Sequence, residues 1–205
     1  MTAIECSGLT KYYGDVRGIE DVSFAVEDGE VFGFLGPNGA GKTTTVRTLL
    51  GFLRPTDGGG RLLGHDITDE ASLRRARERI GYLPSDPGLD TDRTAGAFLD
   101  HQADLRGDAR RDALVDRFGL DESRRIGDLS RGNRQKVALV AAFMHEPDLF
   151  LLDEPTSGLD PLLQESFNRL VRERVDAGAS VLLSSHVLGE VAALCDRVGV
   201  IRDGR

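Results

Sequence analysis

The most chemically specific stretch of the sequence is GPNGAGKT, residues 36 to 43, which follows an apolar run and opens a helix-like segment. Glycines, a lysine and a threonine at this spacing are typical of a phosphate-binding loop, because glycine lets successive backbone N–H groups turn toward phosphate oxygens. We expect the N–H groups of residues 38 to 44 to do so, with Lys42 reaching the β and γ phosphates and the Thr43 hydroxyl binding Mg²⁺. The flanking segments favour this interpretation over a chance glycine-rich turn.

A second chemical element is LFLLDEP, residues 149 to 155, an apolar run that ends in two acids. The carboxyl ends of strands in open α/β sheets are where ligands collect. Asp153 there can hold Mg²⁺ directly or through water, and Glu154 can accept a proton from a water that attacks the γ-phosphate. The alternative for an isolated motif, a solvated acidic turn before Pro155, is disfavoured beside a phosphate loop.

A third stretch, DLSRGNRQK at residues 128 to 136, reads as the start of a helix that continues into VALVAAFM. Ser130, Gly132 and the free backbone N–H groups of such a helix start would suit an anion. The chain thus carries two anion-binding patterns, and one phosphate group does not require both.

Composition limits the function classes. The chain has 205 residues and a net charge of −8, which argues against nucleic acid bound by general phosphate attraction. Its first thirty residues show no secretion signal and no run of eighteen apolar residues occurs, so we expect a cytoplasmic chain that does not cross a membrane itself. Cys6 and Cys195 read as buried free thiols, and the histidines do not cluster as zinc ligands do.

The elements that must position these motifs follow an α/β pattern. IECSGL and VSFAV alternate like antiparallel strands, EVFGFL reads as a strand before the phosphate loop, and TTTVRTLLGF as the helix after it. Residues 55 to 64 read as a turn-rich connection, ASLRRARER as a helix and IGYLP as a strand. The core is completed by three further strands, DLFLLDEP, ASVLLSS and RVGVI. Helices over 161 to 176 and 187 to 195 connect them.

Between these strands the pattern is helical, with AGAFLDHQADLRG, ARRDALVDRFGL and QKVALVAAFMHE. We therefore predict an α/β nucleotide-binding core with an N-terminal antiparallel subdomain, made of residues 1–84 and 146–205, and an inserted helical subdomain over 85–145. The final RDGR signals a turn with no returning strand, which suggests a truncated C-terminus.

The motifs GPNGAGKTT, LSRGN, LFLLDEPTSGLDP and LLSSH, in this order and at these separations, resemble the nucleotide-binding subunit of an ATP-binding cassette (ABC) transporter over essentially the whole chain. The resemblance implies a P-loop NTPase fold. It also implies two cassettes that face each other head to tail, so that the signature stretch of one closes on ATP held by the phosphate loop of the other. The second anion-binding pattern would then serve the partner's nucleotide.

Other roles are carried over from the resemblance alone. Tyr13 matches the aromatic residue that stacks on adenine, with Tyr12 and a core role as alternatives. Asp160 matches the loop that communicates across the dimer, and His186 the switch that contacts the γ-phosphate and orients Glu154. His65, His101 and His145 keep surface or capping roles. The implied nucleotide-binding set is Gly36, Pro37, Asn38, Gly39, Ala40, Gly41, Lys42, Thr43, Thr44, Ser130 and Gly132.

Two stretches depart from the family pattern. Ser85 stands where a glutamine usually helps to bind Mg²⁺ and couples the site to the membrane subunit, so a serine there would need an intervening water. In the signature, Arg131 and Asn133 replace a glycine and a glutamine. Arg131 adds a fixed cation, and its two possible roles are a contact with the partner's nucleotide or a solvated side chain.

The sequence therefore predicts an ATPase with ATP and Mg²⁺ as cofactors, which works as a homodimer beneath a separately encoded membrane subunit. Segment 86–127 is expected to dock that subunit, and the motifs are similar to those of drug or antibiotic exporters. One alternative is a non-transport ABC ATPase that acts on nucleic acid or the ribosome, but such proteins usually carry long insertions for which this sequence has no room. The other is a nucleotide switch without hydrolysis, which the presence of Glu154 and His186 disfavours.

Overall fold

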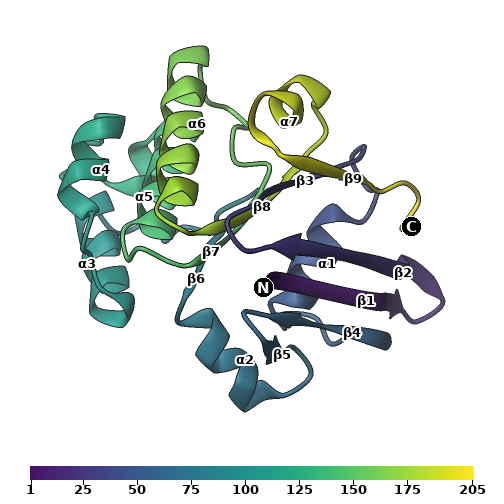
Figure 1. Cartoon of the computed structure of the whole chain (residues 1–205). Helices are drawn as coiled ribbons and strands as arrows, with labels where there is room; N and C mark the ends of the chain where they lie inside the picture. The colour runs from purple at the N-terminus through teal and green to yellow at the C-terminus, as the bar shows by residue number, and fades with distance from the viewer.

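The computed structural model describes residues 1–205 and contains two β-sheets (Figure 1). The first is antiparallel, with the strand order β2 (Val16–Glu27), β1 (Thr2–Tyr13), β4 (Asp57–Leu62) and β5 (His65–Asp66). The second is parallel, with the order β6 (Ile80–Leu83), β7 (Leu149–Asp153), β8 (Ser180–Ser185), β3 (Val31–Leu35) and β9 (Arg197–Val200). The predicted α/β fold with an antiparallel opening is confirmed.

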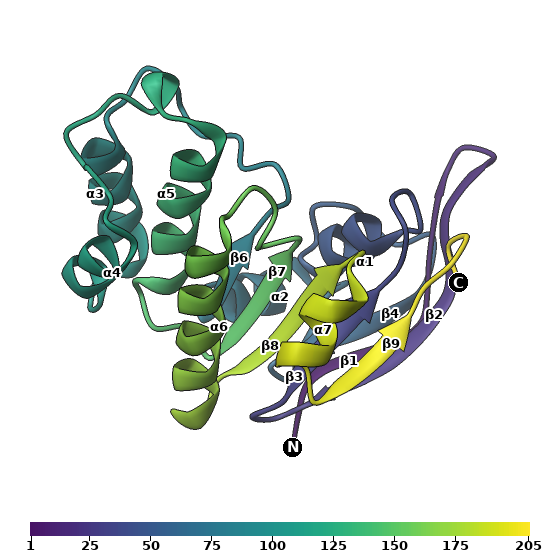
Figure 2. The same cartoon turned by 90° about the horizontal axis from the view of Figure 1, so that it is seen from above.

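The parallel sheet separates two hydrophobic cores. Successive residues of a strand point to opposite faces, and Phe150 and Leu152 belong to one core while Leu149 and Leu151 belong to the other. The first core also contains residues of α6 (Pro161–Asp176) and α7 (Leu188–Leu194), and the second contains α1 (Lys42–Leu49) and the antiparallel sheet. Helix α1 thus lies between the two sheets, as Figure 2 shows from above.

The inserted helices are α3 (Ala95–Arg106), α4 (Arg111–Phe118), a 3-10 turn at Ile126–Asp128 and α5 (Arg131–Phe143). They gather beside α6 at one end of the molecule (Figures 1 and 2). Their apolar faces pack into the same core as β7 and β8, so this segment shares a core with the sheet. The proposed boundaries at 84/85 and 145/146 stay a prediction.

The prediction of a turn-rich connection over residues 55 to 64 is wrong, because this segment contains β4 and the start of the β4–β5 hairpin. In the sequence, the glycines of the run Gly58 to Gly60 read as a turn signal. They instead allow β4 to approach β1 closely, since a Cβ on Gly58 would lie 2.1 Å from the carbonyl oxygen of Gly8, and one on Gly60 2.5 Å from that of Glu5.

The other predicted elements are found within a few residues of their expected ends, including α2 (Glu70–Arg77) and β6. Asp203 and Gly204 form the predicted turn. Both cysteines are free thiols, Cys6 buried and Cys195 partly buried. His101 is exposed, whereas His145 is partly buried and its Nε2 lies 3.3 Å from the carbonyl oxygen of Ile80, so it is a packed residue. No helix is long and apolar enough to span a bilayer.

Candidate functional site

A polar cavity of about 320 Å³ lies where the phosphate loop, residues 36–43, meets the carboxyl end of β7. None of its ten lining residues is hydrophobic, and they are Arg17, Gly18, Asn38, Gly39, Gly41, Lys42, Thr43, Thr44, Ser85 and Glu154. The sequence thus places phosphate-binding, acidic and metal-binding candidates around one cavity, although they come from segments far apart in the chain.

The phosphate loop is shaped by close packing at its ends. A Cβ on Gly36 would lie 2.4 Å from the carbonyl oxygen of Ile201, and Gly41 has φ +109°, which a side chain would strain. The carbonyl of Pro37 accepts a hydrogen bond from the N–H of Ala40 (3.1 Å), which closes the turn. Helix α1 begins at Lys42, within the last two residues of this loop, so its free N–H groups and positive dipole end face the cavity.

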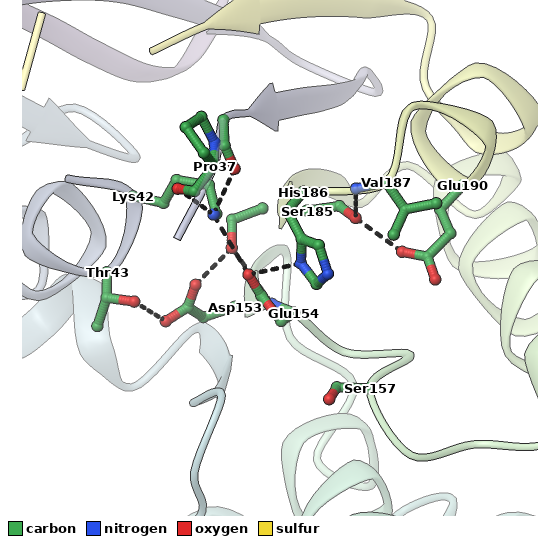
Figure 3. A network of polar contacts seen from close by, with 12 residues as sticks. Pro37, Lys42, Thr43, Asp153, Glu154, Ser157, Ser185, His186, Val187 and Glu190 are labelled. Carbon is green, nitrogen blue, oxygen red and sulfur yellow. Dashed lines mark hydrogen bonds and ion pairs between the residues drawn. The ribbon is translucent and has the colours of Figure 1, made fainter. Parts of the chain in front are cut away.

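Lys42 and Glu154 are paired inside the cavity (Figure 3). The Lys42 side chain is 5% exposed, and its Nζ donates to the carbonyl of Gly36 (2.6 Å) and lies 3.2 Å from Glu154 Oε1. The same Oε1 is 3.1 Å from His186 Nδ1. One carboxylate oxygen therefore stands between an ammonium group and an imidazole.

Asp153 is fully buried next to Glu154, with both carboxylate oxygens engaged. Oδ2 accepts a 2.6 Å hydrogen bond from Thr43 Oγ1, and Oδ1 accepts one from the Ser184 hydroxyl. These oxygens fit Mg²⁺, which is usually held by one or two protein oxygens together with substrate phosphates and water. The chain has no group of three or more His, Cys, Asp or Glu side chains that could hold a metal ion.

Strand β7 and its neighbour β8 hold Glu154 in an unusual backbone conformation. Glu154 has φ +51°, which is uncommon for a residue with a side chain. Its N–H donates to the Ser184 carbonyl (3.1 Å), which fixes the conformation at the sheet edge. Strained backbone of this kind gathers at functional sites, and here it directs the carboxylate toward Lys42.

The two candidate aromatic residues differ in their surroundings. Tyr12 donates its hydroxyl to Glu20 Oε1 (2.7 Å), which ties it to β2. Tyr13 is 47% exposed, and a Cβ on Gly18, a lining residue of the cavity, would lie 2.8 Å from its ring. The position of Tyr13 at the cavity rim supports it over Tyr12 as the base-stacking residue.

Ser130, Gly132 and Asp160, which were also predicted to bind nucleotide, lie at the starts of α5 and α6, and these helices contribute no residue to the cavity. Ser130 caps α5 by accepting from the N–H of Asn133 (3.3 Å), Gly132 lies in the first turn of that helix, and Asp160 caps α6 by accepting from the N–H of Leu163 (3.0 Å). The structure therefore gives these residues helix-capping or packing contacts within one chain and does not bring them to the nucleotide cavity.

The two departures from the family pattern lie near each other. Ser85 lines the nucleotide cavity and also a second cavity that Arg131 and Gln135 line. The Arg131 side chain is exposed, as one of its two expected roles has it, and its guanidinium also donates to the Ser157 hydroxyl (3.0 Å), a contact that the sequence did not predict.

Sequence reasoning missed Arg17, Gly18 and Ser184. Arg17 lines the cavity and pairs with Glu20 (3.2 Å). The Tyr12 hydroxyl and Arg205 donate hydrogen bonds that lower the pKa of Glu20 to about 2. Arg17 and Gly18 lie four and five residues after Tyr13, and this short separation was a signal that could have found them. Nothing in SSH singled out Ser184 as the partner of Asp153.

Comparison with known proteins agrees with this geometry. A sequence model of the ABC transporter family matches residues 19–157. The chain is 38% identical to the probable multidrug ABC transporter ATP-binding protein YbhF of Escherichia coli, covering 100% of this chain and 36% of that protein. It is 40% identical to the daunorubicin/doxorubicin resistance ATP-binding protein DrrA of Streptomyces peucetius, covering 99% of this chain and 63% of that protein.

A solved structure of an ATP-binding subunit of an ABC transporter superposes with a TM-score of 0.91 at 32% identity, covering 100% of this chain and 88% of that one. The chain spans about a third to two thirds of the length of the two curated relatives above. The match to the family model covers most of the chain and includes both the phosphate loop and the acidic pair of β7. With this cavity and these relatives, the chain belongs to the ABC transporter family.

Proposed function

We propose that the chain binds and hydrolyses ATP and that this powers an ABC transporter of the drug-exporting type. The observation that carries the proposal is the cluster in which Glu154 Oε1 lies 3.2 Å from Lys42 Nζ and 3.1 Å from His186 Nδ1, beside a phosphate loop. The drug-resistance and multidrug names of DrrA and YbhF support the exporter type.

The residues divide the chemistry among them. Backbone N–H groups of residues 38 to 44 and the Lys42 ammonium bind the β and γ phosphates, and Tyr13 stacks on the base. Thr43, Asp153 and Ser85 would hold Mg²⁺, and the bound ion would neutralise charge on the phosphate oxygens. Glu154 takes a proton from the attacking water, while His186 holds the carboxylate in place. Positioning and charge stabilisation supply most of the catalysis, and no covalent intermediate is needed.

A second copy of the chain completes the site. Ser130, Gly132 and the N-terminus of α5 lie outside the cavity that contains Lys42, so they have no role toward a nucleotide held in the same chain. A head-to-tail dimer would place them on the partner's γ-phosphate. Asp160, at the start of α6, would then lie at the dimer interface. Segment 86–127 would dock a separate membrane subunit and bring the chain to the inner face of the membrane.

Phosphate release from Mg-ATP tests the proposal, with Glu154→Gln compared with the wild-type chain. We expect the wild type to release phosphate and the variant to lose at least about a hundredfold in rate, as general-base removal commonly does. ATP affinity, measured with a fluorescent analogue, should remain, because Lys42 and the loop are intact.

Glu165→Gln is the matched control, since Glu165 is an exposed carboxylate on α6. Its rate should equal that of the wild type. A wild type that binds ATP but releases no phosphate would favour the nucleotide switch, and a Glu154→Gln variant with full activity would remove Glu154 from the role of base.

A further inference from the structure

The first turn of α5 packs against the loop between β7 and α6, which we call the post-β7 loop (residues 155–160). Gln135, a buried residue of α5, donates through Nε2 to the carbonyl of Pro155 (3.1 Å). Gly132 packs closely on the loop, since a Cβ added to it would lie 3.0 Å from the carbonyl oxygen of Gly158. Helix and loop are therefore in direct contact within one chain.

Arg131 adds a side-chain link to this packing. Its Nη2 donates to Ser157 Oγ (3.0 Å), and its methylene carbons lie 3.7 Å from the place a Cβ of Gly158 would occupy. Gly158 has φ +80°, so the backbone there adopts a turn that glycine favours and leaves space for the arginine stem. The guanidinium is thus directed to a hydroxyl of its own chain.

Ser157 is connected in turn to Glu154. The Ser157 N–H donates to the Glu154 carbonyl (3.1 Å), and the Leu159 N–H donates to the Thr156 carbonyl (3.1 Å), so the loop is a tight turn that begins at Glu154. Glu154 has a positive φ, and its carboxylate lies beside Lys42. The turn from Glu154 to Ser157 must keep its shape for the carboxylate to stay there. A displacement of Ser157 would therefore alter the orientation of Glu154.

We propose that Arg131 is a positioning residue that fastens the post-β7 loop to α5 through Ser157 and so keeps Glu154 aligned for proton transfer. This role rests on the proposed hydrolysis. It differs from both roles that the sequence suggested for Arg131, a contact with the partner's phosphate and a solvated side chain, because it lies within one chain and needs the Ser157 hydroxyl.

Steady-state ATP hydrolysis by Arg131→Ala, Ser157→Ala and the double variant separates these roles. We expect each single variant to lower kcat about three- to tenfold, the range for one lost hydrogen bond, with KM for ATP unchanged. The double variant should be no worse than either single one, and Ser157→Thr, which keeps the hydroxyl, should retain wild-type kcat. Arg169→Ala, at an exposed arginine of α6, is the matched control and should leave kcat unchanged.

A raised KM in Arg131→Ala with an unaffected Ser157→Ala would assign Arg131 to the nucleotide and overturn the proposal, as would unchanged kinetics in both. Amide hydrogen exchange of residues 156–160 gives a readout that does not depend on hydrolysis. Faster exchange in both variants, but not in Arg169→Ala, is expected even if the chain proves inactive on ATP. Unchanged exchange in Arg131→Ala would contradict the link.

Discussion

Lys42, Thr43, Asp153 and Glu154 were found from spacing alone because each belongs to a short motif whose geometry is local. A strand followed by a glycine loop and a helix leaves little choice about where Lys42 and Thr43 point. Ser184 and Ser157 could not be found in the same way, because each forms its hydrogen bond with a residue more than twenty positions away in the sequence, Asp153 and Arg131 respectively. Such contacts are set by the order of strands in the sheet.

Arg17 is the second cation of the cavity after Lys42, and its pairing with ionised Glu20 keeps it at the rim. We predict that Arg17→Ala weakens nucleotide binding about two- to fivefold, which is the loss in affinity expected when one partly exposed ionic contact is removed. Titration with a fluorescent ATP analogue measures this. Arg205→Ala is the control, because Arg205 also contacts Glu20 but does not line the cavity. Equal affinity of Arg17→Ala and wild type would exclude a contact between Arg17 and the nucleotide.

Among the elements, β4 shows how glycines can mislead sequence interpretation. Gly58 has φ +68° and lies against the Gly8 backbone, so Gly58→Ala should destabilise the fold by about 1–3 kcal/mol through backbone strain and a clash with β1. Urea unfolding followed by circular dichroism measures the change. Gly59→Ala is a matched control in the same strand, since nothing lies within 4 Å of its Cβ position. A loss in Gly59→Ala as large as in Gly58→Ala would show that close approach is not the cause.

The end of α5 contains a pH-sensitive contact. Burial, with a smaller contribution from Arg106, lowers the pKa of His145 below its usual 6.5, and its Nδ1 is buried without a hydrogen-bond partner. As pH falls through 6.5 the unfolded chain takes up this proton more readily than the folded chain, so the free energy of unfolding should fall. The contribution is fully present above that pH.

Urea unfolding at pH 7.5 and 5.5 tests this contact, with His145→Gln beside the wild type. The variant should lose less stability between the two pH values. His101→Gln, at an exposed histidine of α3, should behave as the wild type does. An equal loss in wild type and His145→Gln would mean that other groups cause the pH dependence.

For the molecule as a whole, alternating apolar residues in the strands and helical periodicity elsewhere were sufficient to predict an α/β core with inserted helices. They could not predict that α3, α4 and α5 share a core with β7 and β8, because periodicity identifies an apolar face but not what covers it. The pattern DLSRGNRQK by itself predicted only an anion site at the start of a helix, and it was the family resemblance that assigned this site to the nucleotide of a partner. In the structure α5 contributes no residue to the cavity that contains Lys42.

Because α5 lies outside the cavity of its own chain, we propose that ATP bound at Lys42 is closed in by α5 of a second copy. Light scattering of Glu154→Gln on a size-exclusion column, with and without Mg-ATP, tests it most directly. Slow hydrolysis should preserve the bound nucleotide, so we predict the mass of two chains with ATP and of one chain without it. The mass of one chain at saturating ATP would contradict the claim.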